Sequence, residues 1–495
     1  MHTSSGMTFA ADPLISHREG VSNGKPMERS TERRIWGGRV WRRPFKKTGA
    51  KLHHAMVTRQ VVSLRRLGGT RAGEMRYGRF LHNTKVSVNA LVAGICAPTT
   101  ARVAGRHVLA IEDTSEINYQ SHAGRVRNLG SVGNGTDLGL FVHPLLAVDA
   151  EDGACLGLAH LHLWRRTEGA SPKYRDLPIE AKESIRWIDT AQAGKKCLSL
   201  AANITVVADR ECDIYEMWIR VPDERTDLLI RACRDRAADI DASGSLFECI
   251  SRLPLAGTLR VPVPGRPGKR TAHEASLQVR FGEVTLKRPQ HCSDKSAPER
   301  ITVRAIEVIE EAATVVAGEE PIHWRLLTTH EIASWADAVR CIGYYRQRWH
   351  IEQTFRTLKS QGLDIESSLV ESGERMEKLV CLALAASVKI MQLTLARDGT
   401  SERPATDVFN AEEIEVLHHV SPTMEGRTEK QKNPHPPQLL AWAAWVIARL
   451  GGWKGYASER KPGPITMHRG LQAFEGIFIG WKIAIGGREK DVCIR

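Results

Sequence analysis

The segment "NITVVADRECDIYEMWIR", residues 203–220, combines a short strand, an acid and a helix. Its first six residues are mostly apolar and rich in β-branched side chains, which is typical of a buried strand. Asp209 follows this strand directly, and a helical segment comes after it. Ligands of α/β sheets bind beyond the carboxyl ends of the strands. The segment therefore predicts an α/β sheet that presents Asp209 to a ligand.

Segments on either side extend this sheet. A short apolar run, 108–111, ends in Glu112 and Asp113, and two more strand-like runs follow, "LGLFVHPLLAVDAEDG" and "CLGLAHLHLWRR". Their hairpin spacing predicts three antiparallel strands. A helix, "EAKESIRWIDTAQAG", is predicted to stop at Gly194. Together with the strand "DLLIRACRD", the order βββ–α–β–α–β predicts a mixed sheet flanked by helices.

The rest of the chain divides by composition. Pro, Gly and short alternating runs indicate a β-rich insertion, and a long helix is predicted from about Ser334 to Gly362. The apolar run "LVCLALAASVKIMQL" is too short for a membrane span and predicts a buried helix, while "LLAWAAWVIARLGG" is predicted to be the last helical segment. The predicted regions are a basic N-terminal region (1–72), the first part of the mixed sheet (73–238), the β-rich insertion (239–323), a second part that carries the long helix (324–395) and a helical C-terminal region (396–495).

The charge balance predicts a polyanionic partner. The 495 residues contain 70 Lys and Arg against 57 Asp and Glu, which gives a net charge of +13. Residues 29–66 hold twelve of these cations and one acid, Glu32, with Trp36 and Trp41 among them. Such a segment fits a module that contacts DNA phosphates, and the alternative is a disordered basic tail. A basic enzyme without a nucleic-acid partner is the alternative for the whole chain.

The cysteines argue against a structural zinc site. Ten cysteines occur without any C-x2-C pair, so no zinc-finger or zinc-ribbon spacing is present. Free thiols and the lack of a predicted signal peptide favour a reducing cytoplasm, and we expect a bacterial, nucleoid-associated protein without a membrane partner.

The segment "YYRQRWHIEQTFRTLK", residues 344–359, is an unusually basic helix with a single acid, Glu352. At about 100° per residue, its spacing of 3, 4 and 7 places one set of polar side chains on one face. This set is Tyr345, Arg348, Glu352 and Lys359, and the adjacent apolar stripe is Tyr344, Ile351, Phe355 and Leu358. The stripe is suited to packing on the sheet. The alternative is a solvated face with ordinary ion pairs.

Asp113, Asp209 and Glu352 are the candidate metal ligands. Oxygen ligands of this kind suit Mg²⁺ or Mn²⁺ rather than zinc. Two such ions about 3.5–4 Å apart can activate an attacking oxygen and stabilise a leaving oxygen in phosphodiester chemistry. Alternatively, an acid after a strand is a turn or cap residue. The competing acids are Glu112, Glu116, Glu211 and Asp213.

The cations around Glu352 have a role in this interpretation. A cluster of carboxylates repels DNA, so cations are needed to hold the polyanion beside it. We expect Arg348 and Lys359 to bind phosphates that flank the scissile one, and Tyr345 to donate a hydrogen bond to a phosphate oxygen.

These residues resemble the insertion-sequence transposases of the IS-four family, typified by the transposon Tn-five enzyme. The spacing Tyr345-x2-Arg348-x3-Glu352-x6-Lys359 is similar to the Y-R-E-K signature of that family. The stretches "IEDTSEINY" and "VVADRECDIYEM" resemble its two aspartate segments, and "AKESIRW" and "IHWRLLTT" are also similar. The resemblance covers residues 72–395 and, loosely, the "LLAWAAWVIARLGGW" end. The N-terminal "RIWGGRVWRRPFKK" departs from the helical DNA-end-recognition domain of the family.

The resemblance implies an RNase H-like catalytic core (73–238 and 324–395), an N-terminal DNA-binding region (1–72) and a C-terminal dimerisation region (396–495). It also implies a DDE transposase that works by a cut-and-paste mechanism. Asp113, Asp209 and Glu352 would hold two Mg²⁺, and the reaction would pass through a free 3′-OH and a DNA hairpin. Trp324, which lies 28 residues before Glu352, would stack where a base flips out, and Arg231 would touch DNA. The implied partners are transposon terminal inverted repeats, target DNA and a second copy of the chain in a synaptic complex.

Two other function classes use the same residues. An RNase H-like nuclease or resolvase would cleave DNA with these carboxylates and join no ends. A non-catalytic transposase remnant would bind DNA without cleaving it.

Overall fold

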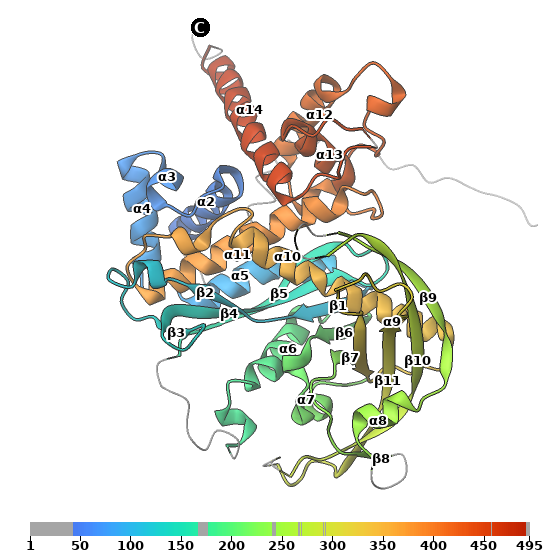
Figure 1. Ribbon diagram of the computed structural model, residues 1–495. Helices are drawn as coiled ribbons and strands as arrows, with labels where there is room; N and C mark the ends of the chain where they lie inside the picture. The colour runs from blue at the N-terminus through green and yellow to red at the C-terminus, as the bar shows by residue number, and fades with distance from the viewer. Residues whose placement is uncertain are drawn as a thin grey trace, which may run out of the picture.

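The computed structural model describes residues 43–491 except 167–176, 240–243, 266, 267, 269, 291, 293 and 457. The first part of the basic segment 29–66, including Trp36 and Trp41, lies outside the described residues. Within them, a single twelve-stranded sheet forms the centre of the molecule (Figure 1). The strands are β1 (His107–Glu112), β2 (Ser115–Asn118), β3 (Gly130–Val132), β4 (Asp137–Asp149), β5 (Cys155–Trp164), β6 (Asn203–Ala208), β7 (Thr226–Arg231), β8 (Ala238–Asp239), β9 (Leu255–Val263), β10 (His273–Lys287), β11 (Arg300–Glu310) and β12 (His323–Thr328).

The centre of the sheet has the predicted mixed topology. β1 pairs antiparallel with β4, and β4 pairs antiparallel with β5. On its other side β1 pairs parallel with β6, which pairs parallel with β7. The three antiparallel strands followed by parallel strands are therefore confirmed. β12 then pairs antiparallel with β7, so its first residues lie at the edge where β7 ends.

The β-rich segment continues this sheet. β12 pairs with β11, β11 pairs with β10, and β10 pairs with both β9 and β8. Figure 1 shows these long strands curving beside α9. The segment also contains the short helix α8, which the Pro- and Gly-rich composition did not indicate.

Helices cover both faces of the sheet (Figure 1). They are α2 (Arg43–Arg59), α3 (Leu64–Gly68), α4 (Arg71–His82), α5 (Val88–Arg102), α6 (Ile185–Cys197), α7 (Tyr215–Arg220), α8 (Leu246–Ser251), α9 (Trp335–Gln347), α10 (Trp349–Leu358), α11 (Gly373–Ala396), α12 (Ala411–Met424), α13 (Leu440–Leu450) and α14 (Pro464–Asp491). Alternate residues of β1 point to opposite faces. Leu109 and Ile111 join the core built with α9, α10 and α11, whereas Val108 and Ala110 join the core built with α6 and α7.

Three predictions about helices differ from the structure. Gly194 does not end α6, because the helix continues to Cys197 and a Cβ at Gly194 would lie 2.0 Å from Cδ2 of Leu145. The glycine is thus needed for close packing on β4. The predicted long helix is divided at Arg348 into α9 and α10. The "LLAWAAWVIARLGG" segment forms α13, and α14 follows it.

The helix α11 is long, apolar and buried, as predicted. Among the described residues, it alone has the length and composition to cross a membrane. In this fold, 89% of its most apolar stretch is buried inside the protein. It packs against α2, α10 and β5, so its apolar surface is used by the core.

Candidate active site

The three parallel strands end together at one edge of the sheet. Asp113 directly follows β1, Asp209 directly follows β6, and Arg231 is the last residue of β7. The strand register places these ends side by side, since Ile111 pairs with Val207. We call this the carboxyl edge and define it by Asp113, Asp209 and Arg231.

Each aspartate uses one carboxylate oxygen for a local turn. The backbone N–H of Thr114 donates to Oδ1 of Asp113 at 2.8 Å, and that of Glu211 donates to Oδ1 of Asp209 at 3.0 Å. Each aspartate is therefore a turn residue through its Oδ1 atom, and its Oδ2 atom takes no part in the turn. The second oxygen of Asp113 points elsewhere and accepts a hydrogen bond from Arg348.

Arg348 joins the helix pair to the carboxyl edge. Its Nη1 lies 2.9 Å from Oδ2 of Asp113, and its Nη2 lies 2.5 Å from Oε1 of Glu352. Arg348 is the residue at which α9 ends and α10 begins. One guanidinium thus links the acid after β1 with the acid on α10.

The electrostatics place Asp209 in the same cluster. Burial raises the pKa of Asp113 to about 7, and the charges of Asp209 and Glu352 add to this rise. Arg348 opposes the rise without cancelling it. Like charges disfavour the ionised form of a buried acid. Asp209 and Glu352 therefore act on Asp113 through their charges, and Asp113 and Glu352 also share the ion-pair partner Arg348.

The donor set suits a hard divalent cation. Within the described part of the chain, no group of three or more His, Cys, Asp or Glu side chains is assembled as a metal site. Here the Arg348 guanidinium supplies the positive charge between Asp113 and Glu352. Carboxylate oxygens are the ligands that Mg²⁺ and Mn²⁺ prefer, and crowded carboxylates with a raised pKa favour an added cation.

The four competing acids have other partners. Glu112 is completely buried on the opposite face of the sheet, beside His143 and Cys212. The remaining three are engaged elsewhere: Glu116 with the N–H of Gly133, Glu211 with Arg186, and Asp213 with Arg236.

Arg186 is a residue that the sequence analysis did not single out. Its Nε donates to Oγ1 of Thr114 at 3.1 Å, and its Nη2 donates to Oε2 of Glu211 at 2.8 Å. These partners adjoin Asp113 and Asp209, so one arginine braces both turns. Its place in the "AKESIRW" helix was visible, but its reach to two loops depends on the fold.

Tyr345 and Trp324 extend the site along α9 and β12. Tyr345 is buried, and its ring packs edge-on against Trp324 with centroids 5.5 Å apart. Burial raises the pKa of Tyr345, whereas the charges of Arg348 and Arg231 lower it. Arg231 also donates to the carbonyl oxygen of His323 at 2.8 Å. Tyr345 therefore contacts Trp324, and the charges of Arg231 and Arg348 act on its hydroxyl.

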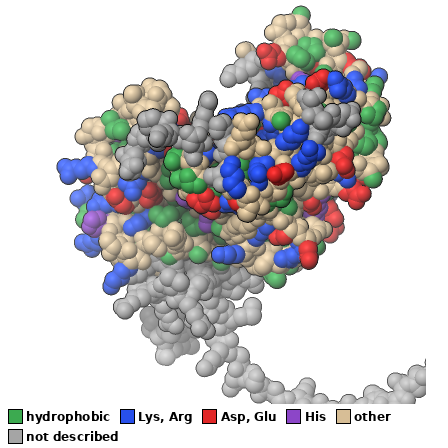
Figure 2. Space-filling view, turned by 90° about the horizontal axis from the view of Figure 1, so that it is seen from below, with side chains coloured by type: hydrophobic (Ala, Val, Ile, Leu, Met, Phe, Trp, Pro, Cys, Tyr) green, Lys and Arg blue, Asp and Glu red, His purple; other side chains and the backbone are tan. Residues whose placement is uncertain are grey.

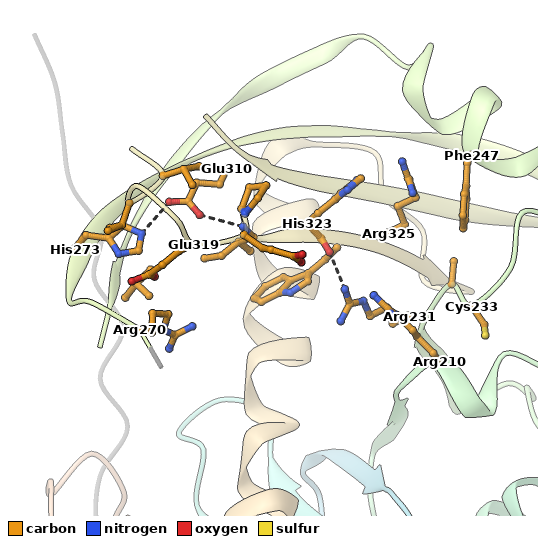
Figure 3. A pocket seen from close by; sticks show the side chains of 18 residues that line it. Arg210, Arg231, Cys233, Phe247, Arg270, His273, Glu310, Glu319, His323 and Arg325 are labelled. Carbon is orange, nitrogen blue, oxygen red and sulfur yellow. Dashed lines mark hydrogen bonds and ion pairs between the residues drawn. The ribbon is translucent and has the colours of Figure 1, made fainter. Parts of the chain in front are cut away.

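A cavity of about 630 Å³ opens beside this group (Figure 3). Its lining mixes both charges and aromatic rings: Arg210, Arg231, Arg270 and Arg325, the acids Glu310, Glu319 and Glu320, His273 and His323, and the rings of Phe247 and Trp324. The guanidinium of Arg325 lies over the ring of Phe247, 4.2 Å from its centroid. Arg210 directly follows Asp209 and could have been found from the sequence. Phe247 belongs to α8 of the β-rich segment, which no local pattern connects to this edge.

Lys359 lies apart from the cluster. Its Nζ forms an ion pair with Oε1 of Glu366 at 3.5 Å, and it follows the last residue of α10. The predicted apolar stripe beside it is buried against the sheet and α11, as its composition indicated.

One comparison with known proteins bears on this site. Residues 188–389 match the family model described as the transposase DDE domain. The matched segment contains Asp209, Trp324 and Glu352, whereas Asp113 precedes it. Members of such a family act on DNA, and Figure 2 shows Lys and Arg side chains spread widely over one face of this basic molecule. The match covers 202 of the 495 residues, and together with the mixed sheet it supports a transposase DDE domain with an RNase H-like fold in this part of the chain.

Proposed function

We propose that the protein is a cut-and-paste DNA transposase of an insertion sequence. The observation that supports this most directly is the ion pairing of Arg348 with both Asp113 and Glu352, beside the neighbouring strand end that carries Asp209. The three acids come from two strand ends and a helix far apart in the sequence, and they crowd one another at a basic edge.

The three carboxylates would hold two Mg²⁺ or Mn²⁺ ions. When bound, these ions would activate the attacking oxygen and stabilise the leaving oxygen of a phosphodiester. Arg348 would donate hydrogen bonds to a phosphate oxygen at the same edge, and Arg186 would keep the two aspartate turns in place. Water would cleave one strand at the transposon end, and the new 3′-OH would attack the opposite strand to give a hairpin. Reopening the hairpin would leave a 3′-OH that joins target DNA.

Trp324 and the cavity would receive an unpaired base. The cavity beside the Trp324 indole is lined by four arginines and three glutamates. The indole would offer stacking to a base, worth about 1–3 kcal/mol per base, and Arg231 and Arg210 next to it would offer positive charge to a phosphate. Tyr345 and Arg231 would contact the backbone around it, and Lys359 would bind a phosphate that flanks the scissile one. This assignment rests on the cavity that borders Trp324 and Arg231.

The synaptic complex would contain two copies of the chain. α14 projects from the helical C-terminal region (Figure 1). It exposes apolar side chains at Ile477, Ile479 and Ile483, the last of them 70% exposed. Exposed isoleucines on a projecting helix suit a partner helix, because burial removes apolar surface from water.

The test uses DNA that carries the flanks of the gene, incubated with purified protein and Mg²⁺. Nicked, then hairpin-ended, then joined products are expected from the wild type, and none from Asp209→Asn. Nicking without joined product would indicate a nuclease. Salt-sensitive binding without cleavage would indicate a non-catalytic protein.

A further inference from the structure

The opposite edge of the same strands carries a second group of polar side chains. β1, β6 and β7 begin there and β12 ends there. We call this the amino edge and define it by His107, Thr205, Asp227 and His330. All four lie on or next to strands, and alternation along the strands turns Thr205 toward the face that α9 covers.

These side chains form a continuous series of short contacts. Nε2 of His107 lies 2.8 Å from Oγ1 of Thr205, and the same oxygen lies 2.8 Å from Nε2 of His330. Nδ1 of His330 lies 3.2 Å from Oδ2 of Asp227. At the other end, the hydroxyl of Tyr344 on α9 lies 3.4 Å from Nδ1 of His107.

The carboxylate fixes the direction of this series. Asp227 can only accept, and its charge beside Nδ1 of His330 favours the tautomer of neutral His330 that carries its proton on Nδ1. Nε2 of His330 then accepts from the Thr205 hydroxyl. The Thr205 oxygen then accepts from Nε2–H of His107, and Nδ1 of His107 accepts from the Tyr344 hydroxyl. Every donor has an acceptor in this arrangement, which is how buried polar groups avoid a desolvation cost.

The order hydroxyl, imidazole and carboxylate also occurs in hydrolase triads. Thr205 is 0% exposed, and its hydroxyl is held between two imidazoles. No substrate carbonyl can reach it. The contacts therefore indicate a positioning role and exclude a nucleophile.

We propose that the Thr205-centred hydrogen-bond chain anchors α9 to the amino edge and thereby positions Arg348 and Glu352 at the carboxyl edge. Tyr344 is the link, because it precedes Tyr345 and lies one helical turn before Arg348. Its ring also packs edge-on against His107, with centroids 5.3 Å apart. A shift of about 1 Å in the placement of a catalytic group can cost about 10²-fold in rate. The effect on cleavage rests on the proposed function, whereas the anchoring of α9 does not.

The first experiment measures anchoring without any catalysis. Thr205→Val keeps the shape of the side chain and removes the hydroxyl, and Thr205→Ser restores the hydroxyl. Hydrogen–deuterium exchange of the α9 amides should be about tenfold faster in Thr205→Val and as slow as in the wild type in Thr205→Ser. Unchanged exchange in Thr205→Val would overturn the proposal. Tyr344→Phe removes the far end of the chain from a different element and should also accelerate exchange, so the test survives if Thr205→Val fails to fold.

The second experiment measures single-turnover DNA cleavage with Mg²⁺. The rate should fall about 10–10²-fold in Thr205→Val and recover in Thr205→Ser, with DNA affinity unchanged. Loose α9 amides with a wild-type cleavage rate would show that anchoring does not serve the active site and would overturn the proposal. A wild-type protein that does not cleave would refute the proposed function instead, and the exchange experiment would still decide the anchoring.

Discussion

The carboxyl edge and the amino edge are the two ends of the same three strands. Like charges lie together at the carboxyl edge, whereas complementary groups are paired at the amino edge. At the carboxyl edge, Asp113 is buried beside Asp209 and Glu352, so its ionised form is costly. At the amino edge, His330 and Asp227 are complementary, and the Thr205 hydroxyl links them to a second imidazole. Perturbed carboxylates cluster at functional sites, whereas closed hydrogen-bond networks stabilise and specify a fold. The carboxyl edge therefore carries charges that lower the stability of the fold. The amino edge carries contacts that hold its strands and α9 together.

The largest expected effect is the loss of cleavage in Glu352→Gln. The substitution keeps the shape of the side chain and removes the charge that a divalent cation needs. Mg²⁺-dependent strand cleavage should fall by about 10³-fold or more, with DNA binding largely intact. The assay is single-turnover nicking of labelled DNA.

Glu331→Gln is the matched control, because Glu331 is an exposed acid outside the cluster. Full cleavage by Glu352→Gln would remove Glu352 from the site and leave the carboxyl edge without its helical acid.

The second prediction separates stability from activity at Asp113. Its folded-state pKa of about 7 exceeds the ordinary 3.8, so the folded protein binds more protons and loses stability as pH rises from about 4 to about 7. In EDTA at pH 8, Asp113→Asn should therefore raise the free energy of unfolding by about 2–4 kcal/mol. Denaturant unfolding measures this, and cleavage should be lost in the same variant.

Mg²⁺ provides the control for this prediction. It should stabilise the wild type, because it binds the folded state, and have little effect on Asp113→Asn. A variant that is less stable than the wild type at pH 8 would show that Asp113 is not under repulsion.

The amino edge should show the opposite pH dependence. Burial lowers the pKa of both His107 and His330. For His330, the charge of Asp227 partly offsets this lowering of the pKa, and the charge of Arg340 adds to it. The unfolded chain then binds more protons below about pH 6.5, so stability falls as the pH falls through this range. His330→Gln should flatten this acid limb of the stability curve measured by urea unfolding in EDTA.

Thr329→Ser, next to His330 in sequence, is a suitable control, since it retains the hydroxyl that donates to Asp227. An acid limb that is equally steep in His330→Gln would assign the acid sensitivity to other buried histidines.

The carboxyl edge was more predictable from sequence than the amino edge. Asp113 and Asp209 directly follow apolar strands, and parallel strands bring their ends to one edge. Glu352 stood out as the single acid on a basic helix. By contrast, Thr205 and His330 resemble ordinary strand and loop residues, and their contacts depend on the pairing of β7 with β12 across a long insertion. Side-chain reach across strands is set by register, which local patterns do not specify.

The break at Arg348 shows the same limit. Composition predicted one helix from Ser334 to Gly362, since neither Gly nor Pro interrupts the signature segment. The structure divides it at Arg348, whose backbone stays in the right-handed helical region while the N–H groups of Arg348 and Ile351 bond to carbonyls three residues back. The Arg348 side chain binds Asp113 at this point, a contact that local composition does not reveal.

The smallest expected effect concerns Lys359, which tests how far the carboxyl edge extends. Its ion pair with Glu366 is partly exposed, and such pairs contribute about 0–1 kcal/mol, so Lys359→Ala should leave the unfolding free energy nearly unchanged. If Lys359 contacts a phosphate in the complex, the slope of log affinity against log salt should become shallower by about 1. Glu366→Gln breaks the same pair and retains the cation, so it should keep the wild-type slope. A cation that leaves counterion release unchanged does not contact the phosphate backbone. If the slope of log affinity against log salt is the same in the wild type and in Lys359→Ala, the cations that contact DNA are therefore Arg348 and its neighbours.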